Sequence, residues 1–241
     1  YRTQFHQTLT AIDTVAAGKN YKIRPSHLGD ALTDSVQGIG FRYALVNLNP
    51  FVVTGFDYES HNQNHELDLY NSDTGFGLTE DYLQSRALLL DAKNVVFSAD
   101  VQADGAGKSE LFGSALGDGV FHDFSTNLNI ETNKRRKPTG QEVPPPVIPE
   151  KTHYLFGSDD DENKGELEGG TKDDHIFGGA GDDIIRGMGG DDYLEGNAGD
   201  DHLSGGKSDQ YADILVGGQG LDTYYITKED GDTIIRDSDL K

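Results

Sequence analysis

Apolar residues recur with a period of nine between residues 169 and 225, each in the middle of a three-residue strand-like segment. Successive apolar positions are 9, 9, 9, 12 and 9 residues apart. Segments this short are not stable as isolated strands. Stacked turns would let each central apolar side chain face one shared interior, so the pattern predicts a parallel β-roll. The predicted core positions are Ile176, Ile185, Leu194, Leu203, Leu215 and Tyr224.

A polar hexapeptide, Gly-Gly-x-Gly-x-Asp, separates the strand-like segments. Glycine permits positive φ angles and close backbone approach, so the hexapeptide predicts a tight turn. Lys172 replaces a glycine in one unit, and Met188 replaces the second glycine in another. We expect Met188 to be tolerated with a negative φ. An aspartate ends each hexapeptide, and these sixth-position aspartates are Asp174, Asp183, Asp192, Asp201, Asp213 and Asp222.

The turns carry the oxygen atoms that a calcium ion requires. Calcium binds about six to eight oxygens, which is more than one hexapeptide can supply. Two turns on the same side of the roll can supply them, so sites are expected between repeat unit n and unit n + 2. Seven units allow at most five sites (7 − 2), although the first is degenerate and the sixth has three extra residues. The units begin at Gly157, Gly169, Gly178, Gly187, Gly196, Gly205 and Gly217.

The repeated unit resembles the RTX family, the haemolysin-type calcium-binding repeats of proteins exported by bacterial type I secretion. The resemblance covers residues 157–225, and residues 230–239 resemble the segment that commonly closes such a repeat block. It implies a mainly β, right-handed parallel β-roll in which the sixth-position aspartates are side-chain ligands. It also implies ligand carbonyls at other turn positions, namely Gly169, Thr171, Gly178, Ala180, Gly187, Gly189, Gly196 and Ala198. The fifth-position aspartates are expected to contribute backbone oxygen and negative potential rather than a carboxylate, and they are Asp173, Asp182, Asp191 and Asp200.

Charge separates the repeats from the rest of the chain. Residues 157–241 hold 23 acidic and 7 basic residues, a net charge of −16, and residues 1–156 hold 19 and 13, a net charge of −6; together they give the −22 of the chain. Such an acidic surface argues against binding to nucleic acid or to an anionic membrane. Without metal, the repeat region has the charge and low hydrophobicity of a disordered segment. The chain has no cysteine and so no disulfide. Calcium is therefore expected to stabilise the fold outside the cell.

The ends of the chain suggest a longer parent protein. No apolar run approaches the ~20 residues of a transmembrane helix, and no signal peptide is visible. The chain begins at Tyr1 rather than at methionine. We therefore expect a fragment of a secreted, extracellular bacterial protein that reaches the type I secretion machinery through its parent.

The residues before the repeats show mixed α/β, partly helical patterns. Helices are expected at residues 5–17, 26–36 and 40–48, and after Thr79, where two acidic residues favour a helix start. Residues 51–53, 95–97 and 119–130 look strand-like. Five of the seven prolines lie within residues 133–151 and indicate an extended linker. The expected domains are a mixed α/β N-terminal flanking domain at 1–132, a Pro-rich linker at 133–155 and an RTX calcium-binding β-roll at 156–241.

No catalytic motif stands out. His61 and His65 are four residues apart, but they lie in an asparagine-rich loop sequence without a His-Glu-x-x-His motif. Ser114 lacks the two flanking glycines of a nucleophile elbow. Gly107-Lys108-Ser109 lacks the first glycine of a phosphate-binding loop. Catalytic residues are therefore not assigned, and whether the parent protein is an enzyme stays open.

These observations predict a calcium-binding module of a secreted protein of the toxin or exoprotein type. The module should be disordered at low cytosolic calcium and fold on binding calcium outside the cell. Two alternatives remain open at this point. The chain could be the C-terminal part of a secreted lipase-like or protease-like hydrolase, or part of an adhesin whose N-terminal domain binds a surface ligand.

Overall fold

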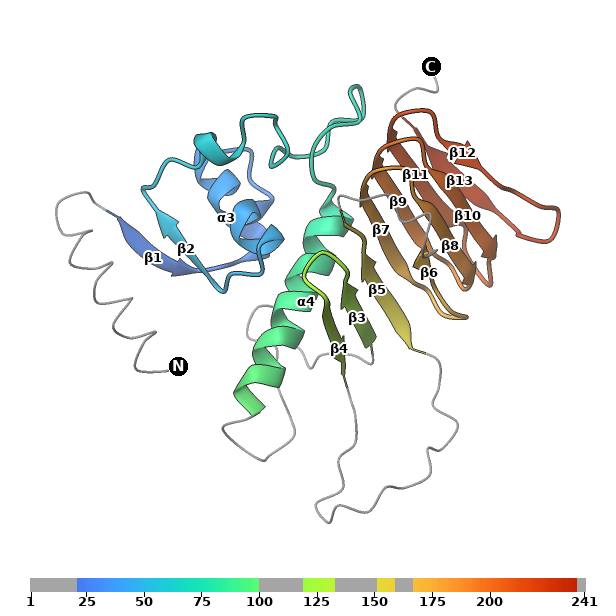
Figure 1. Cartoon of the computed structure of the whole chain (residues 1–241), viewed down its shortest axis with the longest axis horizontal. Coiled ribbons are helices and arrows are strands. Elements are labelled where there is room, and N and C mark those ends of the chain that lie inside the picture. The colour runs from blue at the N-terminus through green and yellow to red at the C-terminus, as the bar shows by residue number, and fades with distance from the viewer. Residues whose placement is uncertain (1–20, 100–118, 133–150, 159–166, 238–241) are drawn as a thin grey trace, which may run out of the picture. The chain divides into compact units, whose positions relative to one another are not determined.

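The computed structural model describes residues 21–99, 119–132, 151–158 and 167–237 (Figure 1). The chain divides into two compact bodies. The N-terminal body holds Tyr1–Leu69 and Gly77–Leu90, and the roll body holds Tyr70–Phe76 and Asp91–Lys241. The helix predicted at residues 5–17 lies outside the described residues.

The N-terminal body contains a two-stranded sheet and short helices. β1 (Lys22–Pro25) pairs antiparallel with β2 (Phe51–Thr54), which confirms the strand predicted at 51–53. The helices predicted at 26–36 and 40–48 are wrong in their bounds, because the structure has α2 (Leu28–Ala31), α3 (Val36–Val46) and the 3-10 helix η1 (Glu59–His61). Ser35 sets the start of α3, since its hydroxyl accepts a hydrogen bond from Gly38 N at 3.0 Å.

The long helix α4 (Glu80–Ala99) begins where the sequence predicts a helix start. Thr79 Oγ1 accepts a hydrogen bond from Tyr82 N at 3.1 Å, and Glu80 and Asp81 lie in the first turn. The strand predicted at 95–97 is wrong, because α4 continues through these residues. Once a helix has formed, each further residue adds a hydrogen bond at little cost. The strand preference of Val95 and Val96 depends on context and does not prevail here.

Strands of the roll alternate between two sheets. One sheet has the order β12-β10-β8-β6, and the other β13-β11-β9-β7-β5-β3-β4. Each long strand of the roll pairs in parallel with the strand of the unit two places away, as predicted; Leu203 of β10, for example, is in register with Ile185 of β8. The repeat strands are β6 (Leu167–Glu168), β7 (His175–Ala180), β8 (Ile184–Gly189), β9 (Tyr193–Ala198), β10 (His202–Lys207), β11 (Asp213–Gln219), β12 (Thr223–Tyr224) and β13 (Thr233–Arg236).

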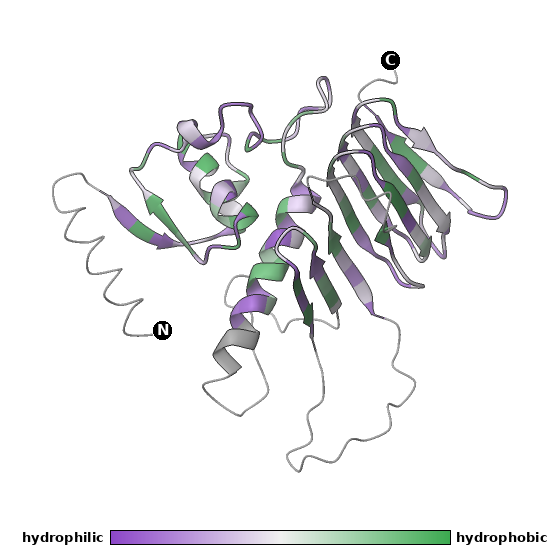
Figure 2. Ribbon diagram, in the orientation of Figure 1, coloured by the Kyte–Doolittle hydropathy of each residue, from purple (hydrophilic) through white to green (hydrophobic). Residues whose placement is uncertain are grey.

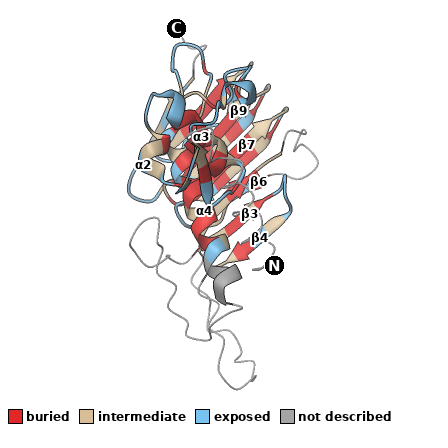
Figure 3. Ribbon diagram, turned by 90° about the vertical axis from the view of Figure 1, so that its left-hand side faces the viewer, coloured by how far each residue is buried: buried red, intermediate tan, exposed pale blue. Residues whose placement is uncertain are grey.

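The interior of the roll is one column of aliphatic side chains, and buried residues follow β7 and β9 in Figure 3. Figure 2 shows hydrophobic residues interspersed with hydrophilic ones along the strands. Ile176, Ile185, Leu194, Leu203 and Leu215 are fully buried in one cluster, and Tyr224 packs against it partly buried. This confirms the predicted core. The cluster also includes Leu155 and Leu167, which precede the regular repeats.

The turns are shorter than the predicted hexapeptide, because strands continue into the first three residues of the next unit. The second position of several units adopts positive φ: 110° at Gly179, 77° at Asn197 and 108° at Gly218. Met188 occupies the same position with φ of 81°, so the expected negative φ is wrong. The repeated turn geometry imposes this backbone conformation whichever residue stands there. The Met188 side chain is half exposed and fills no core space.

The seven-stranded sheet extends beyond the repeats through β5 (Thr152–Phe156), β3 (Gly119–Asp123) and β4 (Leu128–Glu131). β3 pairs in parallel with β5, and β4 closes the edge as an antiparallel hairpin with β3. Stacked rings follow this extension, with centroids 4.7 Å apart for Phe121 and Tyr154 and 5.3 Å for Phe156 and Phe177. The strand prediction at 119–130 is thus confirmed as two strands. Because these strands and β5 join the sheet of the roll, they cross the predicted boundaries at 132 and 155; the division into three folding domains stays a prediction.

Candidate metal centre

Five of the six sixth-position aspartates are buried at the ends of the strands, and Asp222 is partly buried. The exposed fraction is 0 % for Asp174, Asp183, Asp201 and Asp213 and 1 % for Asp192. Each turn delivers one carboxylate to the interior because the aspartate stands two residues before the central core residue of the following strand. Side chains alternate along a strand, so this spacing places the carboxylate on the core side.

Hydrogen bonds link these aspartates into two ladders. Asp192 Oδ1 accepts from Asp174 N at 2.8 Å, and Asp213 Oδ1 accepts from Asp192 N at 2.9 Å. In the other ladder, Asp201 Oδ1 accepts from Asp183 N at 2.9 Å, and Asp222 Oδ1 accepts from Asp201 N at 3.0 Å. Even-numbered units therefore form one ladder, and odd-numbered units form the other.

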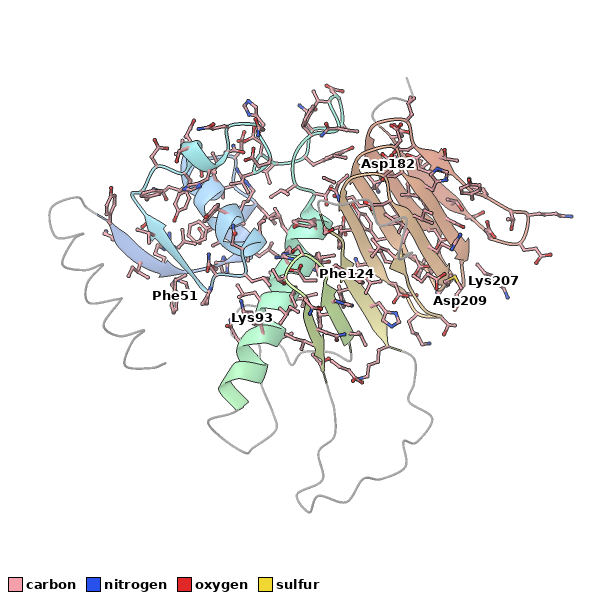
Figure 4. The ribbon with its side chains drawn as sticks, in the orientation of Figure 1. Phe51, Lys93, Phe124, Asp182, Lys207 and Asp209 are labelled. Atoms are coloured by element: carbon pink, nitrogen blue, oxygen red, sulfur yellow. The ribbon has the colours of Figure 1, made fainter. Side chains whose placement is uncertain are left out.

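The two ladders lie at opposite edges of the roll. Figure 4 shows Asp182, in the turn of the third unit, at one edge and Asp209, in the turn of the sixth unit, at the other. This follows from the sheet order, because consecutive strands belong to different sheets and each pair of strands is joined by a turn. The arrangement confirms that turns n and n + 2 are neighbours, which the predicted sites require.

The second oxygen of three buried aspartates lacks a donor, and at Asp192 and Asp201 a main-chain carbonyl oxygen lies nearby. Oδ2 of Asp192, Asp201 and Asp213 is buried and has no hydrogen-bond partner. A Cβ atom added to Gly187 would collide with Asp192 Oδ2 and lie 2.6 Å from Gly205 O; one added to Gly196 would collide with Asp201 Oδ2 and lie 2.6 Å from Gly217 O. Gly187 and Gly196 thus let a carboxylate oxygen of their own unit and a carbonyl oxygen of the unit two places on approach the backbone closely.

Burial makes these carboxylates costly to ionise. It raises the pKa of Asp192 to about 8, with the charges of Asp174 and Asp213 adding to the shift. Burial likewise raises the pKa of Asp201 to about 7 and that of Asp213 to about 6. A hydrogen bond from a backbone N–H opposes the shift in each case but does not cancel it. Burial therefore favours a proton or a compensating cation at Asp192, Asp201 and Asp213.

The donor set fits calcium. Among the described residues, no group of three or more His, Asp or Glu side chains is gathered as a conventional metal site. At Gly169, Gly178, Gly187 and Gly196 the atoms that meet are instead a carboxylate oxygen and a main-chain carbonyl oxygen, the hard oxygen ligands that calcium prefers. Calcium would be held by the sixth-position aspartates and would supply the positive charge that these buried groups lack.

The remaining predicted ligands lie in the same turns. Ala180 is aligned with Ala198 across β7 and β9, and Gly189 N donates a hydrogen bond to Gly170 O at 3.1 Å, beside Thr171. The first-position residues Gly169, Gly178, Gly187 and Gly196 each lie against the aspartate of their own unit. Which of these carbonyls binds an ion stays a prediction.

A second, exposed set of hydrogen bonds was not anticipated from the sequence. Asp173 Oδ1 accepts from Asp191 N at 3.0 Å, and Asp182 Oδ1 accepts from Asp200 N at 2.8 Å. Asp191 accepts from the backbone N–H groups of Asp209, Gln210 and Tyr211. The fifth-position carboxylates thus hold the turn two units on. The Asp-Asp doublet was the available signal, because both carboxylates recur with the nine-residue period.

The histidine candidates, which the structure does describe, form no comparable site. His65 Nδ1 lies 2.8 Å from Asp68 Oδ2, but both side chains are exposed, and the His61 ring packs at a tilt against Tyr43, with centroids 4.9 Å apart. Ser114 and residues 107–109 lie outside the described residues.

Comparison with protein families agrees with this geometry. Residues 166–194, 177–209 and 186–224 match the family model of the RTX calcium-binding nonapeptide repeat (4 copies). The chain therefore carries RTX calcium-binding repeats at residues 166–224, which confirms the resemblance for this region. No curated protein and no solved structure matches the chain. Within the described residues, no helix has the length and apolar character needed to cross a membrane.

Proposed function

We propose that the roll is a calcium-dependent folding module in which ions bind between alternate turns. The observation that carries this proposal is the pair of buried carboxylate ladders, whose Oδ2 atoms at Asp192, Asp201 and Asp213 have no hydrogen-bond donor. Buried negative charge of this kind destabilises the folded state unless it is compensated. A divalent cation at the turns compensates it and links two turns at once.

We infer four ions at the described turns, from the pairing of alternate units in the two ladders. Two lie in the ladder of even-numbered units, between Asp174 and Asp192 and between Asp192 and Asp213. Two lie in the other ladder, between Asp183 and Asp201 and between Asp201 and Asp222. The fifth site allowed by the repeat count would use the first unit, whose turn at 159–166 lies outside the described residues.

Calcium binding and folding are coupled in this proposal. The repeat region has a net charge of −16 (23 acidic and 7 basic residues), which opposes compaction when no cation is bound. Extracellular calcium modules bind with Kd of about 10⁻⁴–10⁻³ M. The roll would thus remain unfolded at low cytosolic calcium and fold outside the cell.

RTX repeats are typical of secreted bacterial proteins. We infer on that basis that a type I machinery exports the parent protein and that the module belongs to a toxin or another exoprotein. Within the described residues, no specific observation favours the hydrolase or the adhesin alternative.

Native mass spectrometry of the whole chain in calcium tests the proposal. We expect four bound ions for the wild type and two for Asp192→Asn, because Asp192 belongs to two sites. Asp209→Asn is the matched control: Asp209 lies at the same edge, but its side chain is exposed and outside the inner ladder, so four ions should remain. A wild-type chain that binds no calcium would overturn the proposal.

A further inference from the structure

The inner ladder of even-numbered units continues one step beyond the repeats, to His153. Each sixth-position Oδ1 accepts a hydrogen bond from the backbone N–H two turns back. Asp174 Oδ1 does the same, and its donor is His153 N at 2.6 Å. The register agrees, because Tyr154 of β5 is aligned with His175 of β7. His153 therefore occupies the place in the ladder where an aspartate stands in the regular units.

The His153 ring also contacts the Asp174 carboxylate. His153 Nδ1 lies 3.3 Å from Asp174 Oδ1 and 3.4 Å from Oδ2. Gly170 N donates a further hydrogen bond to Asp174 Oδ2 at 2.5 Å. Both oxygens of Asp174 thus meet donors of the protein itself, whereas Oδ2 of Asp192 and Asp213 in the same ladder has no hydrogen-bond partner.

The turn around Asp174 differs from the regular turns at Gly170, where the His153 ring packs. A Cβ atom added to Gly170 would lie 2.9 Å from His153 Cε1, so the ring packs directly on this glycine. At the equivalent Gly179, Gly206 and Gly218, the added atom would instead meet a main-chain carbonyl oxygen of the turn two units back. Those three glycines have positive φ and Gly170 does not. An imidazole therefore stands at Gly170 where carbonyl oxygens stand in the regular turns.

We propose that His153 ends the calcium ladder: its ring and its N–H group take the place of an ion on the β5 side of Asp174, so that no ion binds between His153 and the turn of the second repeat unit. This inference rests on the proposed calcium binding. His153 is then a positioning residue that fixes β5 to the first regular turn, and it is not a calcium ligand. The stack gains an N-terminal end at which Asp174 needs no ion on its His153 side, while the proposed ion between Asp174 and Asp192 is kept.

The test combines two readouts on the whole chain in saturating calcium. Native mass spectrometry counts bound ions, and amide hydrogen exchange reports on Tyr154, Leu155 and Phe156 of β5. His153→Ala should keep the wild-type ion count and speed exchange of these amides about tenfold or more, the scale expected for losing a hydrogen bond to a charged group. His153→Asn, whose amide nitrogen replaces Nδ1, should restore slow exchange. His202→Ala, a histidine on the other sheet beside Tyr225, should leave both readouts unchanged.

The outcomes separate the two proposals. Loss of one ion in both His153→Ala and His153→Asn would make His153 a ligand and overturn the inference, as would unchanged β5 exchange in His153→Ala. If His153→Ala fails to fold, the result for His153→Asn decides. A wild-type chain without bound calcium would instead contradict the proposed function.

Discussion

Two glycines of β8 show how differently single residues are constrained. A Cβ atom on Gly187 would collide with Asp192 Oδ2, whereas the nearest atom to one on Gly189 is Lys207 O at 3.7 Å. We predict that Gly187→Ala weakens calcium binding at least tenfold, about 1.4 kcal/mol, and that Gly189→Ala changes it by less than about threefold, or roughly 0.6 kcal/mol. Calorimetric titration with calcium measures both. Equal effects of the two substitutions would contradict the inference that Gly187 must lack a side chain for the oxygens of Asp192 and Gly205 to lie together.

The raised pKa values of Asp192, Asp201 and Asp213 make the stability of the metal-free roll depend on pH. Protons bound to these carboxylates should partly replace the stabilising effect of calcium. An unfolded aspartate has a pKa of about 3.9, and the folded values are about 8, 7 and 6. Between about pH 4 and pH 8 the metal-free roll therefore binds more protons than the unfolded chain. Its stability is greatest at the acidic end and falls as the pH rises through the folded pKa values.

We accordingly predict that, in chelator, the β signal in far-UV circular dichroism is larger at pH 5 than at pH 8. With saturating calcium the difference should shrink, since ions rather than protons then compensate the carboxylates. A metal-free β signal that grows from pH 5 to pH 8 would be inconsistent with the buried ladders.

At the residue scale, the inner aspartates could be predicted from the sequence, because each one stands two residues before a core residue in every regular unit. His153 could not, since it stands 21 residues before Asp174 in a segment without the glycine pattern. Only the strand register reveals that it continues the ladder.

At the scale of elements, the backbone conformation of each turn is determined more by stacking against its neighbours than by the residues of the turn itself. Met188 has φ of 81°, a left-handed conformation that costs a non-glycine residue about 1–2 kcal/mol. We predict that Met188→Gly raises the free energy of unfolding by about 0.5–1 kcal/mol in saturating calcium, after the larger entropy of the unfolded glycine is included. Urea denaturation measures this change. Met188→Ala keeps the conformational strain and serves as the control; a destabilised glycine variant would show that the side chain contributes to packing.

The repeat strands could be predicted because a nine-residue period specifies both the core residue and the pairing partner. The extension through β5, β3 and β4 could not, because these strands lie outside the period and are recognised only by their pairing. The end of α4 was missed for a similar reason. Local preference at Val95 and Val96 indicates a strand, but continuation of the helix prevails.

The whole molecule combines a small partly helical body with an acidic roll whose interior carries carboxylates at both edges. The aliphatic column stabilises the stack by burying apolar surface. Near neutral pH, the buried carboxylates of the ladders destabilise the folded stack until a cation is bound. This destabilisation is the physical basis of the proposed calcium dependence. It arises only in the assembled roll, because each proposed site needs the turns of two repeat units.

The central claim is tested most directly by far-UV circular dichroism of the intact chain during a calcium titration, with magnesium as the control. We predict a cooperative gain of β signal at about 10⁻⁴–10⁻³ M calcium and no comparable gain with magnesium, which binds fewer protein ligands in a stricter octahedral geometry. A full β signal in chelator at pH 8, unchanged by added calcium, would contradict the account and make the roll a constitutive scaffold.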